Sequence, residues 1–245
     1  MILGERTSPE LAASHAAAAS NVVVLVPLGS TEQHGPHLPL DTDTRIAIAL
    51  AQSAAEAFPA EGVFVAPALA YGSAGEHAGF AGTISIGQEA LELVVIELVR
   101  SLTAQGAKTV LVNGHGGNAA VLGRSARRLR REGHAVWLWA PEVPGGDAHA
   151  GRTETSLLAF LAPELVRWDR LERGNAQPLR TLMAQLQAGG LRTVSPNGVL
   201  GDPTGSSAEE GEKLFEMLIA QLKSVVRAAL DSSGSVTVVI DPAEE

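Results

Sequence analysis

The chain has 245 residues, of which 45% are hydrophobic and 18% are charged, a balance typical of a protein that buries a substantial core. Its 27 acidic side chains outnumber the 18 basic ones, and the formal net charge of −9 argues against a nucleic-acid or anionic-membrane partner. Because cysteine is absent, disulfides and cysteine-ligated zinc are excluded, and any metal ion must be bound by His, Asp and Glu. We expect a cytoplasmic protein, since no apolar run reaches the roughly 20 residues that span a bilayer and the N-terminus lacks signal-peptide features.

Short runs of β-branched residues alternate with longer helical patterns. Strands are predicted at 22–26, 63–66, 109–112 and 135–138, and they lack the polar alternation of strands with one exposed face. Helices are predicted at 11–19, 44–58, 88–105, 118–131, 153–161, 179–187 and 208–230. The repeated order of strand, helix and strand predicts an α/β fold, a three-layer α/β/α sandwich with a mostly parallel sheet.

No internal repeat or linker marks a boundary, so a single domain is predicted for 1–245, with 231–245 as an edge strand or a loose tail. Three polar stretches begin at or soon after predicted strand ends: GSTEQHG, NGHGGN and GGDAHAGRTETS. Ligands of open α/β sheets bind outside the carboxyl ends of the strands, so these loops are expected to converge on one rim. The ionisable side chains brought there are Glu32, His34, Asp43, His115, His149 and Glu154.

The first of these loops carries the most acidic and imidazole groups. Glu32 and His34 are two residues apart, so an extended backbone directs both side chains to the same side. Asp43 can return to that point because the Gly-Pro-His-Leu-Pro excursion fixes a tight loop. Two carboxylates and an imidazole suit Zn²⁺, Fe²⁺ or Mn²⁺. A structural alternative stays open, with Asp43 as the N-cap of the next helix and the other two as solvated loop residues.

The second loop places His115 among three glycines, which allow the backbone to approach a ligand or an ion closely. His115 is a candidate ligand from a second strand end, or else an ordinary turn histidine. The same string satisfies the G-x-G-x-x-A pattern of dinucleotide-binding loops from Gly114 onward. No good candidate stands where that pattern expects an acidic residue, about 20 positions later. A nucleotide-binding module is therefore the weaker alternative.

The third loop carries His149 and Glu154, five residues apart, with the glutamate in the first turn of a predicted helix. The helix dipole favours a carboxylate there, so a capping role is the structural alternative. Amide hydrolysis needs one group that accepts a proton from the attacking water and another that protonates the leaving amine. His149 and Glu154 are the candidate catalytic pair.

Five segments in order resemble the creatininase family of metal-dependent amidohydrolases over nearly the whole chain: LGSTEQHGPHLPLDTD, EHAGFAGTIS, VNGHGGN, DAHAGRTETS and GVLGDPT. The resemblance implies an α/β/α fold, a closed homo-oligomer such as a hexamer, and one or two divalent ions. The implied metal ligands are Glu32, His34, Asp43 and His115, with Asp43 as the bridge. In creatininase a glutamate two residues after the NGH histidine binds the second metal, whereas this chain has Gly117 there. A second ion then lacks a ligand or recruits Glu154, whose role as ligand or proton carrier stays open.

Within the family, the fuller strings are most similar to a peptidase branch that removes a C-terminal Val-Tyr dipeptide from a modified precursor peptide during assembly of a redox cofactor. A peptide substrate is therefore implied. The alternative is another creatininase-like activity, opening a cyclic amide or hydrolysing a formamide, with the deciding pocket side chains expected around Trp137, Trp139 and 141–147. His77 is expected to line the pocket or to hydrogen-bond a carboxylate, unless it is structural, and His37 is expected to face away from the ion.

Overall fold

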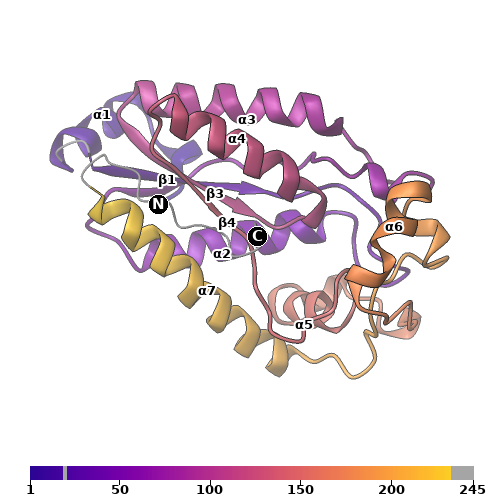
Figure 1. Cartoon of the computed structure of the whole chain (residues 1–245). Coiled ribbons are helices and arrows are strands. Elements are labelled where there is room, and N and C mark those ends of the chain that lie inside the picture. Colours follow the sequence, from indigo (N-terminus) through magenta and orange to yellow (C-terminus); the bar gives the residue numbers. More distant parts are fainter. Residues whose placement is uncertain (19–20, 233–245) are drawn as a thin grey trace.

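The computed structural model describes residues 1–18 and 21–232 (Figure 1). Within these residues a sheet of parallel strands has the order β2-β1-β3-β4. The strands are β1 (Val22–Leu28), β2 (Val63–Val65), β3 (Ala107–Asn113) and β4 (Val136–Trp139). All seven residues of the central strand β1 are buried, which explains why its sequence lacks polar alternation.

Helices cover both faces of this sheet. Figure 1 shows α3 (Gly87–Ala104) and α4 (Ala119–Arg131) over one face and α2 (Thr42–Glu56) and α7 (Ala208–Asp231) over the other. Successive residues of β1 pack into the two apolar layers in turn, as the strand period of two requires. The predicted three-layer α/β/α sandwich is confirmed.

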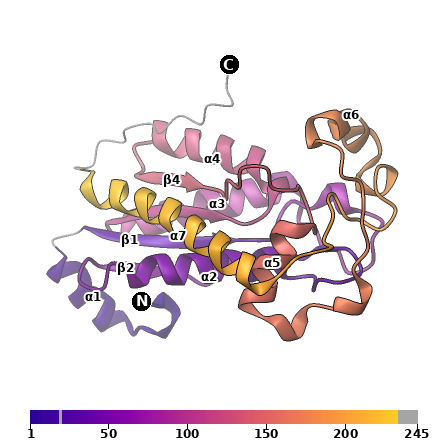
Figure 2. The same ribbon diagram turned by 90° about the horizontal axis from the view of Figure 1, so that it is seen from below.

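The remaining helices lie at the two ends of the molecule. α1 (Ser8–Ala17) is at one end, while α5 (Arg152–Leu161) and α6 (Leu179–Gly189) are at the other, beyond the carboxyl ends of the strands (Figures 1 and 2). In the described part of the chain, none of the helices combines the length and the apolar character needed to cross a membrane.

Two element boundaries differ from the sequence-based expectation for physical reasons. β1 continues beyond Val26 through Pro27, whose carbonyl accepts a hydrogen bond from Leu69 N–H on the side where β2 has already ended. The missing proline N–H therefore leaves no gap in the ladder. The N-cap of α2 is Asp41, so the structural alternative that made Asp43 the cap is wrong. Most of the predicted edge strand or tail lies outside the described residues, at 233–245.

Two glycines let the first turn of α2 sit against the ends of β1 and β3. A β-carbon at Gly29 would collide with Thr44 Oγ1, and one at Gly114 would lie 2.6 Å from the carbonyl oxygen of Asp43. No real β-carbon tolerates such an approach to backbone, so position 114 requires glycine. The close packing holds Asp43 at the carboxyl edge of the sheet, between the two strands.

We expect Gly114→Ala to lower the free energy of unfolding by about 1–3 kcal/mol, because the added methyl group forces β3 and α2 apart. Gly116→Ala is the matched control, since it lies in the same loop and its β-carbon would meet no atom within 4 Å. Its expected effect is within about 0.5 kcal/mol. Urea denaturation of the two metal-free variants measures this difference. Equal losses would contradict the packing argument.

Candidate metal centre

The structure brings all six predicted side chains to the carboxyl edge of the sheet. Asp43 lies between two imidazoles, with its Oδ1 2.8 Å from His34 Nε2 and its Oδ2 3.2 Å from His115 Nδ1. Glu32 Oε1 also lies 3.2 Å from His115 Nδ1. Loops that follow β1 and β3 therefore meet at one carboxylate, as parallel strand ends at one rim allow.

The loop before α5 and the first turn of that helix contribute the other two, His149 and Glu154. His149 Nδ1 is 3.7 Å from Glu32 Oε1, and Glu154 Oε2 is 3.8 Å from His34 Nε2. Glu154 Oε2 also accepts a hydrogen bond of 2.6 Å from Ala150 N–H. Ala150 has a φ of 50°, in the left-handed region that non-glycine residues rarely adopt. This strained turn joins His149 to the start of α5 and directs both side chains inward.

Three of the imidazoles have their hydrogen placement fixed by the backbone. Each places one ring nitrogen near a carbonyl oxygen: His34 Nδ1 at 3.2 Å from Glu32, His115 Nε2 at 3.2 Å from Ser73 and His149 Nε2 at 2.9 Å from Gln33. A carbonyl can only accept, so that nitrogen carries the hydrogen. In the neutral rings the opposite nitrogen therefore directs a lone pair at carboxylate oxygens.

Buried charge at this edge is not balanced by hydrogen bonds. Glu32 is 0% exposed, and neither its carboxylate oxygens nor Asp43 Oδ2 has a hydrogen-bond partner among the described residues. Burial raises the pKa of Glu32, and the Asp43 charge adds to this. Burial alone would lower the pKa of His34, but the nearby carboxylates of Asp43, Glu154 and Glu32, with Asp43 contributing most, together raise that pKa to about 10. In the metal-free protein, protons on these side chains therefore take the place that a metal cation could occupy.

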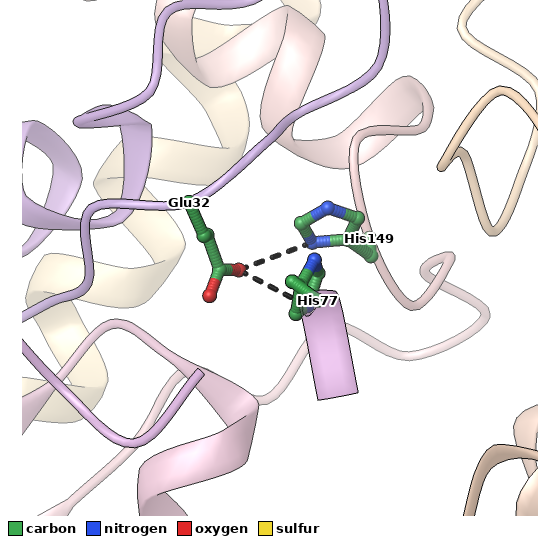
Figure 3. A group of neighbouring side chains, drawn as sticks. All are labelled: Glu32, His77 and His149. Carbon is green, nitrogen blue, oxygen red and sulfur yellow. Dashed lines mark ion pairs between the residues drawn. The ribbon is translucent and has the colours of Figure 1, made fainter. Parts of the chain in front are cut away.

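The donor atoms at this edge are of the right kind and close enough together to bind a divalent ion. Three groups of candidate ligands have donor atoms within 4.8 Å of one another: Glu32, Asp43 and His115; His34, His149 and Glu154; and Glu32, His77 and His149 (Figure 3). Unpaired carboxylate oxygens facing imidazole lone pairs repel one another unless a cation lies between them. Nitrogen and oxygen donors without sulfur suit Zn²⁺, Fe²⁺ or Mn²⁺. Asp43 turns one oxygen to each side, as a bridging ligand does.

Two residues that the sequence did not single out also belong to the site. Gln33 contacts His77 and His149 through its side-chain amide, at 2.9 and 3.1 Å. Glu76 Oε1 lies 3.5 Å from His115 Nε2, and a β-carbon at Gly117 would collide with it. Glu76 thus fills the space beside Gly117, on the side of His115 turned away from Asp43. Their adjacency to Glu32, His34 and His77 in the motifs was the available signal.

Other predicted residues divide between the site and the core. His77 Nε2 lies 3.3 Å from Glu32 Oε1, a close contact but not the hydrogen bond that was one of the expectations for His77. His37 faces Thr155 Oγ1 at 2.9 Å, and burial lowers its pKa to about 4. The expectation that Trp137 and Trp139 line a pocket is wrong, because both pack in the apolar layer between the sheet and α7.

The two remaining loop segments support the third loop. Asp147 accepts hydrogen bonds from the backbone N–H groups of Arg152 and Thr153 at the start of α5, so it fixes this turn. Leu200, in the GVLGDPT segment, pairs with the backbone of His149 in both directions. That segment therefore borders the site.

The Gly114 loop does not favour a nucleotide. The carboxylates of Glu32, Asp43 and Glu76 all lie within 3.5 Å of the His115 ring nitrogens, next to the start of α4. A pyrophosphate at this helix N-terminus would meet negative charge instead of free N–H groups. The nucleotide-binding alternative is not favoured.

Comparison with known proteins agrees with this geometry. The family model described as creatinine amidohydrolase matches residues 4–226. The chain is 51% identical over 202 residues to the mycofactocin precursor peptide peptidase of Mycobacterium ulcerans, covering 80% of this chain and 81% of that protein. It is 50% identical over 220 residues to the protein of that name from Mycolicibacterium smegmatis, covering 88% and 89%.

Solved structures give the same assignment. A tryptophan-to-phenylalanine mutant of creatininase superimposes with a TM-score of 0.79 at 27% identity, over 94% of this chain and 99% of that one. A Zn-Zn type of a glutamate-to-glutamine creatininase mutant gives a TM-score of 0.78 at 27% identity, over 94% and 98%. The fold, the rim and the sequence match together show that the chain belongs to the creatininase family of amide hydrolases.

Proposed function

We propose that this protein is a metal-dependent peptidase that releases a C-terminal Val-Tyr dipeptide from the modified mycofactocin precursor peptide. Two relatives named mycofactocin precursor peptide peptidase share about half of their residues with this chain over most of its length. The observation that carries the metal-dependent part is the meeting of unpaired buried carboxylates with imidazole lone pairs at Asp43. Activity on a cyclic amide or a formamide is the alternative and is not favoured, because the creatinine amidohydrolase of Pseudomonas putida is only 29% identical, over 93% of this chain and 96% of that protein.

Glu32, Asp43 and His115 would hold one ion, and Asp43 with His34 would face a second position. When bound, such an ion supplies a Lewis acid that polarises the scissile carbonyl and acidifies water. The identity of the ion is proposed as Zn²⁺, Fe²⁺ or Mn²⁺ from the donor set. A closed homo-oligomer, a hexamer or similar, and a cytoplasmic location belong to the same proposal and rest on family resemblance and composition.

His149 and Glu154 are proposed to move the protons. His149 is neutral because burial lowers its pKa well below the ordinary value, and its Nδ1 lone pair can accept a proton from the attacking water. Glu154 is 22% exposed, so a substrate can reach it, and burial of its carboxyl raises the pKa to about 7. Its protonated form can give that proton to the leaving amine nitrogen.

The direct test is a cleavage assay on the modified precursor peptide, read by mass spectrometry. We expect the zinc-loaded protein to shorten the peptide by the mass of Val-Tyr, and a chelator to stop the reaction until zinc or manganese is returned. His115→Ala should abolish cleavage because it removes a ligand. His15→Gln, on α1 at the far end of the molecule, should leave it intact. An uncut peptide together with hydrolysis of creatinine would contradict the peptidase assignment.

Glu154→Gln separates the two roles left open for this residue. As a proton carrier, its loss should lower kcat by about 10²- to 10⁴-fold and remove the limb of the pH profile that reports it, with metal content unchanged. Elemental analysis and steady-state kinetics are measured on the same samples. The control is Glu164→Gln, an exposed glutamate just beyond α5. Loss of one equivalent of metal from the first variant alone would instead make Glu154 a ligand.

Metal binding should release protons at neutral pH. His34 has a pKa of about 10 in the metal-free cluster, so it is protonated at pH 7, whereas a ligand nitrogen must be bare. Metal affinity should therefore rise with pH through the neutral range, up to about that pKa. Isothermal titration calorimetry in buffers of different ionisation enthalpy counts the protons. Binding without proton release would contradict the electrostatic account of the cluster.

A further inference from the structure

The buried side-chain amide of Gln33 has only one possible orientation. Its Oε1 accepts a hydrogen bond of 2.9 Å from Gly35 N–H, and its Nε2 donates one of 3.1 Å to the carbonyl of Gly198. A backbone N–H can only donate and a carbonyl can only accept, so exchanging the amide oxygen and nitrogen would break both bonds. A β-carbon at Gly198 would collide with Gln33 Oε1, which explains the glycine in this segment.

The second hydrogen of this amide goes to His77. Gln33 Nε2 lies 2.9 Å from His77 Nδ1 and 3.1 Å from His149 Nε2. His149 Nε2 is itself a donor, because it lies 2.9 Å from the backbone carbonyl of Gln33. The two amide hydrogens therefore have two acceptors, the Gly198 carbonyl and His77 Nδ1. It follows that His77 Nδ1 is bare and that its hydrogen is on Nε2.

Two imidazoles thus approach the same carboxylate oxygen, one with a nitrogen that carries a hydrogen and the other with a nitrogen that carries a lone pair. The hydrogen-bearing Nε2 of His77 lies 3.3 Å from Glu32 Oε1, and the bare Nδ1 of His149 lies 3.7 Å from it (Figure 3). A metal ligand needs a lone pair on the nitrogen that faces the ion. His149 offers one there and His77 does not, although distance alone groups both with Glu32.

We propose that Gln33 is a positioning residue that fixes the hydrogen of His77 on Nε2, the nitrogen on the Glu32 side, and so excludes His77 from the metal-ligand set. Its Nε2 remains in close contact with Glu32, at 3.3 Å from Oε1, so His77 is an outer neighbour of a proposed ligand. The zinc measurements below rest on the proposed metal centre, whereas the hydrogen placement on His77 does not.

The first test is NMR of ¹⁵N-histidine protein, both metal-free and zinc-loaded, with His77 identified by comparison with His77→Gln. We expect His77 to carry its hydrogen on Nε2 in both states and its Nε2 signal to stay in place on zinc loading. His115 Nδ1 should shift, as a ligand nitrogen does. A hydrogen on His77 Nδ1, or a zinc-induced change at His77 Nε2 like that at His115, would overturn the proposal. This measurement needs no variant at Gln33.

The second test is zinc affinity by competition with a coloured chelator. Gln33→Met and His77→Gln should weaken zinc binding by about 10- to 100-fold, the range usual for partners of ligands. His115→Gln should cost more than this, and His15→Gln should cost nothing. Equal losses in His77→Gln and His115→Gln would overturn the proposal. If the wild-type protein binds no zinc, the proposed function fails, while NMR of the metal-free protein still decides where the His77 hydrogen lies.

Discussion

The site depends on one buried carboxylate that two imidazoles share. Asp43 is 1% exposed and lies between His34 and His115, which come from loops after different strands. It can occupy this place because α2 starts at the sheet edge and Gly114 lets the two backbones approach. The parallel order of β1 and β3 brings both loops to one rim. Sheet order, helix start and glycine placement all serve the position of this one side chain.

Electrostatics explains why such a cluster is tolerated inside a folded protein. Carboxylates buried without partners are costly, and neutral imidazoles that face them with lone pairs add repulsion. Protons relieve the conflict in the metal-free chain, as the raised pKa of His34 and His115 shows. A divalent cation would relieve it more completely, because it accepts lone pairs from several ligands at once. The carbonyl contacts of the three imidazoles prepare the cluster for that exchange.

Much of the architecture followed from the sequence because it depends on local periodicity. The β-branched runs, the helical stripes and the polar loops at strand ends predicted the layers and the rim. Side-chain hydrogen bonding was less accessible, since the roles of Gln33 and Glu76 depend on which loops approach them in space. For Trp137 the sequence predicted a role in the pocket that the structure does not show. A large aromatic side chain in this part of the sequence can equally well pack beneath a helix, as Trp137 does.

The family assignment and the local chemistry independently indicate a metal centre. Relatedness to amide hydrolases predicts a metal centre, while buried unpaired oxygens and fixed imidazole hydrogens call for a cation without reference to any relative. Gly117 departs from the creatininase pattern, and the structure places Glu76 in the adjoining space but not beside Asp43. A second ion, if it binds as proposed, would therefore have ligands other than the glutamate expected from the creatininase pattern.

The central claim is that a cation binds between Glu32, Asp43 and His115. Anomalous diffraction at the zinc edge, from crystals of the zinc-loaded protein, tests it most directly. The account predicts a peak about 2.0–2.2 Å from His115 Nδ1 and from carboxylate oxygens of Glu32 and Asp43. No peak at this point under saturating zinc, or peaks only at surface residues, would contradict it.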